Sequence, residues 1–392
     1  WERANMNWSA VCGGGVGCAM MYLEPDMFKK CLPRFLKALE YFFSGFPSDG
    51  ACLEGVSYWN YGFGFFVYFA DLLEQFTDGE INLFDDEKVK EIAKYPLKVF
   101  MKGDTCVSFS DGARRTKLSR ALFSFLHNKY PEDIPVLEDD FTRFRSGNVS
   151  FVHCLRNFLY YDSKIEKQEF ARADYYLPSA EHTYINKEKY SLAIKAGNND
   201  EPHNHNDVGN FIISTENGQI LCDLGAAKYT MQYFSDERYN IITCGSQGHN
   251  LPIINGKTQC AGKEYCGKMA FEDGTVTVDI ANAYPQNTID KFTRTFKYDE
   301  EKIILTDEFS EFDSIVERFV SLIEPEIFEN YVKISNLIVR FNSDEVELNV
   351  STDSHVEHIS TMASGNGIAT VWLIDFNLKK DLDKTTFTFE IC

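Results

Sequence analysis

The first third of the chain carries apolar side chains at the spacing of α-helices. In residues 26–46 (DMFKKCLPRFLKALEYFFSGF), phenylalanine and leucine recur every three or four positions, which indicates a helix with one buried face. The same spacing returns in residues 61–76, 87–101 and 117–130, and turns that contain Gly or Asp separate these segments. Residues 1–130 are therefore predicted to form successive helical hairpins in a stacked or ring-like array.

The second half of the chain changes to short β-rich segments bounded by turn residues. Two of these turns carry strong hairpin sequences, Asn-Gly within residues 215–220 and Asp-Gly within residues 271–276. We therefore predict an antiparallel β-sandwich for residues 151–392, with residues 131–150 as the linker. The strand segments are YSLAIKA, NFIIST, QILCDLG, TVTVDIA, FTRTFKY, KIILTDEF, NLIVRF and VELNVS.

The length and composition fit two folded domains. At 392 residues, with 44% hydrophobic and 15% aromatic residues, the chain can bury a large core. A formal net charge of −20, from 39 basic and 59 acidic side chains, argues against nucleic acid as a partner. No apolar run reaches the length of a membrane span, so no membrane partner is expected. The 11 cysteines contain no C-x-x-C pair and are expected to be buried thiols.

The segment NDEPHNHNDVGNF, residues 199–211, concentrates polar side chains before an apolar run. His203 and His205 are two positions apart, so on a strand they would point to the same face. Asp223 lies in ILCDLG, at the end of the next hairpin, and His249 lies in the Gly-rich loop GSQGHNLPIING. Two histidines and a carboxylate suit Zn²⁺, so His205, Asp223 and His249 form a candidate metal site. Hydrogen-bonded packing histidines are the alternative, because no H-E-x-x-H or C-x-x-C signature fixes a metal.

Two segments of the helical half are poor in helix formers or crowded with aromatic rings. NMNWSAVCGGGVG, residues 5–17, holds a glycine triplet, but it lacks the Lys-Ser/Thr of a phosphate-binding loop. EGVSYWNYGFGFF, residues 54–66, places Tyr58, Trp59 and Tyr61 between glycines. Such a cluster fits either an aromatic helix buried in the core or a wall that stacks on the apolar faces of sugars.

Four segments together resemble the heparinase II/III-like polysaccharide lyases. They are NWSAVCGGGVG, EGVSYWNYGF, NDEPHNHNDVGNFI and RYNIITCGSQGHNLPIING, in this order between residues 7 and 256. The resemblance implies a multidomain α+β fold in which a partial α/α toroid, residues 1–130, precedes the antiparallel β-sandwich. It also implies that further toroid helices precede Trp1, where the sequence has no signal-peptide pattern and suggests a mature form or a fragment.

The resemblance implies a β-elimination on a uronic-acid-containing polysaccharide, such as a glycosaminoglycan or alginate. In that reaction the uronate carboxylate is neutralised while a base removes the C5 proton of the sugar. Asn7 matches the neutralising residue of the family, with Asn5 as the neighbouring alternative. Tyr61 and His203 match the base and the acid, with Tyr58 as the alternative phenol.

The resemblance also assigns a cofactor and substrate contacts. His205, Asp223 and His249 match the structural zinc shell of the family, so zinc is the expected cofactor. The net charge of −20 and the few basic residues around the motifs favour a sparsely sulfated or unsulfated acidic polysaccharide as the partner. The expected substrate-binding residues are Tyr58, Trp59 and Arg238.

Two other functions stay open at this stage. A metal-dependent glycan hydrolase would use the zinc to activate water, and a non-catalytic carbohydrate-binding protein would keep the aromatic surface without proton chemistry. The different tasks of His203 and His205 also require a bend, a bulge or a loop conformation near Asn204. Bacterial periplasmic, secreted and cytoplasmic locations all stay open, as do the oligomeric state, the linkage cleaved and endo or exo action.

Overall fold

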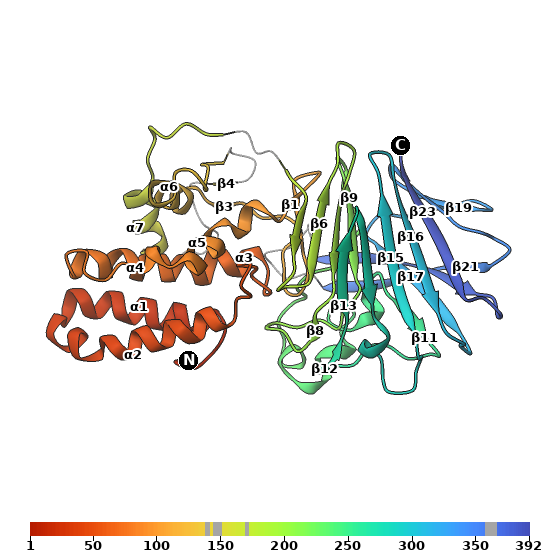
Figure 1. Ribbon diagram of the computed structural model, residues 1–392, viewed down its shortest axis with the longest axis horizontal. Coiled ribbons are helices and arrows are strands. Elements are labelled where there is room, and N and C mark those ends of the chain that lie inside the picture. Colours follow the sequence, from red (N-terminus) through yellow and green to blue (C-terminus); the bar gives the residue numbers. More distant parts are fainter. Residues whose placement is uncertain (138–141, 144–150, 169–171, 357–366) are drawn as a thin grey trace. The chain divides into compact units, whose positions relative to one another are not determined.

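The chain folds into two compact units, one helical and one built of sheets (Figure 1). The computed structural model describes residues 1–137, 142–143, 151–168, 172–356 and 367–392. The helical unit comprises Trp1–Val99 and Thr116–Arg172, and the sheet unit comprises Phe100–Arg115 and Ala173–Cys392. No helix in these described ranges is both long and apolar enough to span a membrane.

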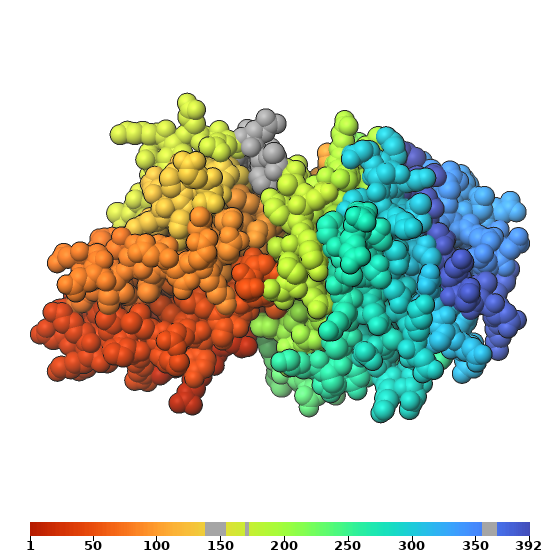
Figure 2. Space-filling view, in the orientation of Figure 1, coloured from red at the N-terminus to blue at the C-terminus, as the bar shows by residue number. Residues whose placement is uncertain are grey.

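Antiparallel helices that share aromatic side chains form the helical unit. Helix α1 (Asn7–Leu23) is joined to α2 (Pro25–Ser44) by one residue, and α4 (Gly64–Phe76) packs on α1. The surfaces of these helices adjoin in the red and orange parts of Figure 2. The shorter helices are α3 (Val56–Tyr58), the π-helical turn η1 (Trp59–Phe63), η2 (Leu83–Asp85), α5 (Glu87–Lys94), η3 (Tyr95–Leu97), α6 (Arg120–Lys129) and α7 (Phe151–Tyr160). Two short strands, β3 (Leu118–Ser119) and β4 (Thr142–Arg143), pair in parallel.

The glycine triplet of α1 serves helix packing. A Cβ atom at Gly14 would lie 2.8 Å from the carbonyl oxygen of Phe65, and one at Gly17 would lie 2.5 Å from the ring of Phe69. Both contacts are with α4 or its first turn, so the glycines let the two helix backbones approach closely. This packing role accounts for Gly14 of the triplet and for Gly17 in a helix whose propensity is otherwise poor.

Antiparallel sheets form the second unit, so the antiparallel part of the fold prediction is confirmed. The three large sheets have the strand orders β10-β9-β7-β6-β5, β11-β17-β22-β21 and β13-β14-β15-β16-β23-β20-β19-β18. Short pairs are formed by β1 with β2 and by β8 with β12. Apolar side chains from all three large sheets meet in one core, to which Leu192, Phe296 and Phe376 belong.

The strand bounds follow the alternation expected from the sequence. The Asp-Gly turn is confirmed as a hairpin between β13 and β14, with positive φ at both Asp273 and Gly274. The first strands are β1 (Phe100–Met101), β2 (Thr105–Cys106), β5 (Tyr175–Leu177), β6 (His182–Asn186), β7 (Ser191–Lys195), β8 (Asn198–Asn199), β9 (Phe211–Thr215), β10 (Gly218–Leu221), β11 (Pro252–Ile254) and β12 (Gly262–Cys266). They are followed by β13 (Lys268–Glu272), β14 (Thr275–Asp279), β15 (Phe292–Tyr298), β16 (Lys302–Phe309), β17 (Ile315–Ser321), β18 (Glu326–Ile327), β19 (Tyr331–Ile334), β20 (Leu337–Arg340), β21 (Val346–Val356), β22 (Ile368–Leu378) and β23 (Lys384–Ile391). The single-turn helices of this unit are η4 (Gln232–Phe234), η5 (Asp236–Asn240), η6 (Ser246–Gly248) and η7 (Ala281–Ala283).

The boundaries of the units differ from the predicted domain boundaries in two places. Residues 151–172, expected in the β-sandwich, belong to the helical unit because α7 joins a buried polar network there. Tyr160 donates a hydrogen bond to Asp71 of α4 at 2.7 Å, and Ser119 donates one to Asn157 of α7 at 2.8 Å. Residues 100–115, expected among the helices, belong to the sheet unit. The predicted linker, residues 131–150, lies partly outside the described residues.

A buried ionic network crosses the core of the sheet unit. Arg294 of β15 contacts Asp307 of β16 at 2.9 Å and Glu317 of β17 at 3.1 Å, and all three side chains are fully buried. Burial and the charge of Asp307 raise the pKa of Glu317 well above its ordinary value, although Arg294 opposes the shift. Folding therefore favours the protonated form of Glu317.

The raised pKa of Glu317 predicts how stability varies with pH. A carboxyl group whose pKa is raised by folding stabilises the fold below its unfolded pKa of about 4.3, and this contribution is lost as pH rises toward the folded pKa. The variant E317Q lacks this titration, so its free energy of unfolding is expected to fall less between acid and neutral pH. The difference in decline is expected to be about 1 kcal/mol or more, since one pKa unit corresponds to about 1.4 kcal/mol.

Denaturant unfolding at several pH values measures this decline in the wild type and in E317Q. The variant E308Q is the matched control, because Glu308 is an exposed carboxylate on β16, with 52% of its side chain accessible. A decline in E317Q as steep as that of the wild type would contradict the raised pKa of Glu317.

Candidate functional site

One buried carboxylate, Asp111, organises the polar residues of the sheet unit. Its Oδ2 accepts hydrogen bonds from Nδ1 of His203 at 2.6 Å and from the hydroxyl of Tyr229 at 2.8 Å. Its Oδ1 accepts from Nε2 of His205 at 3.0 Å, from Nη2 of Arg238 at 3.2 Å and from the hydroxyl of Tyr233. Burial alone would raise the pKa of Asp111, but the bonds from the two histidines and the charge of Arg238 hold it well below its ordinary value.

The segment of the two histidines is a loop, which agrees with one of the conformations allowed by the sequence. It lies between β8 and β9, and His203 adopts a left-handed backbone with φ +57°. Strict strand alternation therefore does not apply, and the two rings reach Asp111 from different directions. Arg238 fixes the loop through bonds to the carbonyl oxygens of His203 at 3.1 Å and of Asn204 at 3.0 Å.

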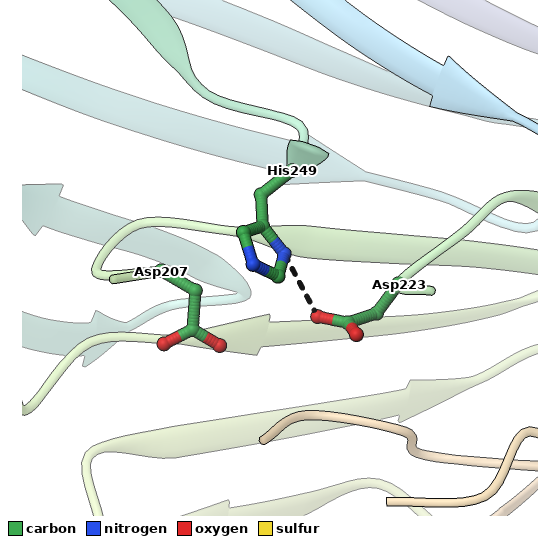
Figure 3. A group of neighbouring side chains, drawn as sticks. All are labelled: Asp207, Asp223 and His249. Atoms are coloured by element: carbon green, nitrogen blue, oxygen red, sulfur yellow. Dashed lines mark ion pairs between the residues drawn. The ribbon is translucent and has the colours of Figure 1, made fainter. Parts of the chain in front are cut away.

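A second buried cluster lies beside this loop and has the composition of a metal site (Figure 3). Asp207, Asp223 and His249 each offer one ligand atom, and these atoms all lie within 4.8 Å of one another. Nδ1 of His249 is 3.1 Å from Oδ2 of Asp223, and Asn210 donates a hydrogen bond to the same oxygen at 2.8 Å. All three side chains are fully buried. The predicted residues Asp223 and His249 are thus brought together, and Asp207 joins them.

The residues of this cluster fit a bound divalent cation. Nδ1 of His205, Oδ2 of Asp207 and Nε2 of His249 are buried and have no hydrogen-bond partner among the described residues. The rings of His205 and His249 lie 5.5 Å apart between centroids. Buried polar atoms are costly when they are unsatisfied, and imidazole nitrogens and carboxylate oxygens are ligands that Zn²⁺ accepts. A cation bound by Asp207, Asp223 and His249 would satisfy Oδ2 of Asp207 and Nε2 of His249, whereas the predicted ligand His205 lies next to this group and is not part of it.

Charged groups around the cluster offset one another's cost of burial. The ammonium group of Lys195 lies 2.7 Å from Oδ1 of Asp207, and both side chains are fully inaccessible. Burial lowers the pKa of His205, but Cys244 and Asp111 outweigh this effect and raise it to about 10. Burial raises the pKa of Cys244, but the charge of His205 reverses the shift. A metal ion at Nδ1 of His205 would therefore have to replace a proton.

The helical unit brings two further predicted residues together. Asn7, at the start of α1, is buried and donates a hydrogen bond through Nδ2 to Oε2 of Glu54 at 2.7 Å. Tyr61 lies in the π-helical turn η1, next to Gly62, where a Cβ atom would come within 2.9 Å of Cβ of Asn7. Short π-helical segments are frequent at functional sites because they alter the direction of side chains. Burial raises the pKa of Tyr61, so a role as base requires a nearby group that stabilises the phenolate.

Two of the expected substrate contacts need correction. Trp59 is fully buried, stacks on Phe63 and donates a hydrogen bond from its indole nitrogen to the carbonyl oxygen of Ile92 at 2.7 Å. It is a core residue and cannot stack on a sugar. The guanidinium of Arg238 binds Asp111 and three backbone carbonyl oxygens, which favours a positioning role over contact with substrate. Tyr58 is half-buried, and Asn5 is exposed.

Sequence reasoning missed the residues that support the predicted ones. Asp111 lies in SDG, a turn sequence between the predicted helices, and nothing in this local sequence indicates a partner 92 positions away. Glu54 carries no signal beyond its place in the aromatic motif. Asp207 lies in HNHND, where its place two positions after His205 could have indicated a third ligand.

The profile of the C-terminal domain of heparinase II/III-like proteins matches residues 167–386, more than half of the chain. The chain belongs to the heparinase II/III-like family. Its matched region contains the loop of His203 and His205 and the cluster of Asp207, Asp223 and His249. No sequence among curated proteins gives a significant match.

Solved structures extend the likeness of this heparinase II/III-like chain to the helical unit. The heparan sulfate lyase HepC from Pedobacter heparinus is similar over 97% of this chain and 59% of its own, with a TM-score of 0.65 and 11% identity. A heparinase III structure has a TM-score of 0.66 and 17% identity over 97% of this chain and 60% of its own. Chondroitin AC lyase from Streptomyces coelicolor A3 has a TM-score of 0.50 and 7% identity over 93% of this chain and 58% of its own. The chain thus spans about three fifths of the length of these structures, and at such identities the likeness concerns the fold.

The contact between Gly62 and Asn7 gives a direct test of the geometry in the helical unit. A Cβ atom in the variant G62A would meet Cβ of Asn7 at 2.9 Å, so we expect a loss of about 1–3 kcal/mol from overpacking. Thermal or denaturant unfolding measures this loss. The matched control is G64A, two positions along, where the nearest atoms lie at 3.9 Å and alanine is expected to be neutral or stabilising by up to about 1 kcal/mol. Equal stability of the two variants would contradict the close approach.

Proposed function

We propose that this protein is a polysaccharide lyase that cleaves a uronic-acid-containing polysaccharide by β-elimination. The observation that carries the proposal is the pairing of His203 with the buried carboxylate of Asp111, 2.6 Å from its Nδ1, within a heparinase II/III-like domain. A histidine held by a carboxylate is a common arrangement for a residue that gives or accepts protons. Membership of the family and the lyase folds of the neighbouring structures support the same reaction class.

The proposed architecture extends the helical unit to a partial α/α toroid. The hairpin of α1 and α2 and the packing of α4 on α1 are the repeating helix pairs that a toroid requires. The described helices would form only a part of such a ring. This proposal agrees with the share of the neighbouring structures that the chain spans.

The proposed reaction divides three tasks among Asn7, Tyr61 and His203. The C5 proton of a uronate becomes acidic enough for removal only when the carboxylate is neutralised, and the amide of Asn7 would donate the hydrogen bond that does so. Glu54 fixes the direction of this amide by accepting one of its two N–H hydrogens at 2.7 Å. The phenol of Tyr61 and the imidazole of His203 would remove the C5 proton and protonate the leaving oxygen of the glycosidic bond.

We further propose a structural zinc ion in the sheet unit. His205, Asp223 and His249 would hold it, and Asp207 is a further ligand within reach. When bound, the zinc would supply positive charge that holds the loops of these residues together. The complete burial of Asp207, Asp223 and His249 argues against a metal-dependent hydrolase, because a metal-activated water in such a place would not reach a polysaccharide.

The proposed substrate is a sparsely sulfated or unsulfated polymer that contains uronic acid, such as a glycosaminoglycan or alginate. A net charge of −20 disfavours the binding of a densely charged polyanion. The names of two similar structures refer to heparan sulfate and chondroitin, which are uronate polymers of this general kind.

The lyase proposal predicts an unsaturated uronate at each new non-reducing end. The full-length protein should raise the near-ultraviolet absorbance of at least one polymer among heparan, chondroitin, hyaluronan, alginate and bacterial polyuronates. Y61F should lower kcat by about 10²–10⁴-fold, because the phenol moves a proton in the transition state. Y58F distinguishes the alternative phenol, and Y22F, at a tyrosine of α1 that is 71% exposed, is the matched control. No absorbance on any of these polymers from folded protein would contradict the proposal.

The zinc proposal predicts about one bound zinc ion per chain by elemental analysis of the purified protein. Removal of the zinc by a chelator should lower the free energy of unfolding. The loss should be about 2.7 kcal/mol when the reference is protein at a free zinc concentration of 100 times the Kd. H249A should lose both the zinc and the response to the chelator. H182N is the matched control, because His182 is an equally buried histidine of the same unit, bonded to Tyr184 at 2.9 Å. Zinc retained in H249A would exclude this site.

A further inference from the structure

Two histidines with different expected tasks donate to the same carboxylate. His203 uses Nδ1 to bind Oδ2 of Asp111 at 2.6 Å, whereas His205 uses Nε2 to bind Oδ1 at 3.0 Å. An ionised carboxylate only accepts hydrogen bonds, so the bonded nitrogen of each ring must carry the hydrogen. In the neutral form of each ring, the nitrogen without a hydrogen is then Nε2 in His203 and Nδ1 in His205, and the proton on Nδ1 of His205 is the one that a metal ion would replace.

The surroundings of the two rings agree with this opposite assignment. The side chain of His205 is fully buried, and by hydrogen-bond geometry its Nδ1 has no partner among the described residues, although the thiol of Cys244 interacts with this ring and raises its pKa. The side chain of His203 keeps 12% of its surface accessible, so that this ring alone of the two is open to solvent. Because the backbone at His203 is left-handed, the side chains of His203 and His205 are not held on one face as in a regular strand.

We propose that Asp111 is the positioning residue that assigns His203 to proton transfer through Nε2 and His205 to metal binding through Nδ1. The inference rests on the proposed function for the task of His203, but the ring geometry and the metal affinity do not depend on turnover. Asp111 touches neither the substrate nor the metal in this scheme. It acts by fixing which nitrogen of each ring is protonated.

The position of Asp111 is itself fixed from several sides. Tyr229 and Arg238 donate to its two oxygens, and Arg238 also lies over the ring of Tyr233, 4.2 Å from its centroid. The loop of Asp111 is anchored to the strand end that carries Asp223. Ser108 donates a hydrogen bond to the carbonyl oxygen of Asp223 at 3.2 Å.

The first test uses the wild-type protein and therefore does not depend on the folding of a variant. Nitrogen NMR of zinc-loaded protein with labelled histidine rings, in mildly alkaline buffer, reports which ring nitrogen bears the hydrogen. The signals of His203 are identified by their loss in H203Q. We expect the hydrogen on Nδ1 of His203, and a hydrogen on Nε2 instead would overturn the proposal.

The second test compares D111N with D71N in the full-length protein. The two histidines bind different oxygens of Asp111, and an asparagine offers only one oxygen, so zinc affinity, measured by competition with a chelating dye, should fall by about 10–100-fold. The kcat should fall by about 10²-fold with little change in KM, since proton transfer and not binding is impaired. Asp71 is a buried aspartate of α4 that pairs with Arg156 and accepts a hydrogen bond from Tyr160. D71N therefore makes the same carboxylate-to-amide change at a residue that bonds neither histidine, so zinc affinity and kcat should stay within about threefold of the wild type.

The outcomes separate this inference from the proposed lyase activity. If D111N matches D71N in both zinc affinity and kcat while circular dichroism shows a native fold, Asp111 has no positioning role. If no polymer is cleaved, the lyase proposal fails, yet the NMR signals and the loss of zinc affinity in D111N would still support the assignment of the two rings. A loss of zinc affinity as large in D71N would mean that the effect is not specific to Asp111 and would overturn the proposal.

Discussion

The buried negative charge of Asp111 is the interaction on which the arrangement of the sheet unit's polar loops depends. A carboxylate removed from water is costly unless donors surround it, and five described side chains converge on this one. Those donors come from the loop of His203 and His205 and from the segment 229–238. Two loops that are separate in sequence are therefore held in one place by one charge.

Other buried ion pairs also hold loops of the sheet unit in place. Lys195, at the end of β7, contacts Glu201 at 3.0 Å and Asp207 at 2.7 Å, and so fixes both sides of the histidine loop. Arg294 donates to the carbonyl oxygens of Gly209 at 3.2 Å and of Asn250 at 2.7 Å. The apolar core holds the sheets together, whereas these charges hold the loops that carry Asp207, Asp223 and His249. A metal ion bound by these three residues would satisfy Oδ2 of Asp207 and Nε2 of His249, which have no hydrogen-bond partner among the described residues.

Close packing of small and aromatic residues fixes the geometry of the helical unit. Gly14 and Gly17 let α1 approach α4, and Gly62 lets the π-helical turn approach Asn7. The burial of Trp59 anchors that turn, which leaves its neighbours Tyr58 and Tyr61 at least partly accessible. A residue predicted to contact substrate thus serves to place the residues beside it.

Local sequence was enough to predict the element types, the hairpins and the candidate residues for catalysis and metal binding. The 3.6-residue and two-residue periods of apolar side chains follow from which face of a helix or strand is buried, so they can be read without a structure. The Asp-Gly turn and the motifs around Asn7, Tyr61 and His203 are local for the same reason. Membership of the heparinase II/III-like family was equally contained in four short motifs.

The contacts that support these residues join segments far apart in the sequence, so they were found only in the folded chain. Asp111 lies 92 positions from His203, and a turn sequence such as SDG contains no information about a partner at that distance. The transfer of residues 100–115 to the sheet unit, the burial of Trp59 and the place of Asp207 beside Asp223 and His249 likewise depend on contacts between distant segments. Periodicity shows that a side chain is buried, but which charge it meets is set by packing, because the cost of burying a charge is balanced only in three dimensions.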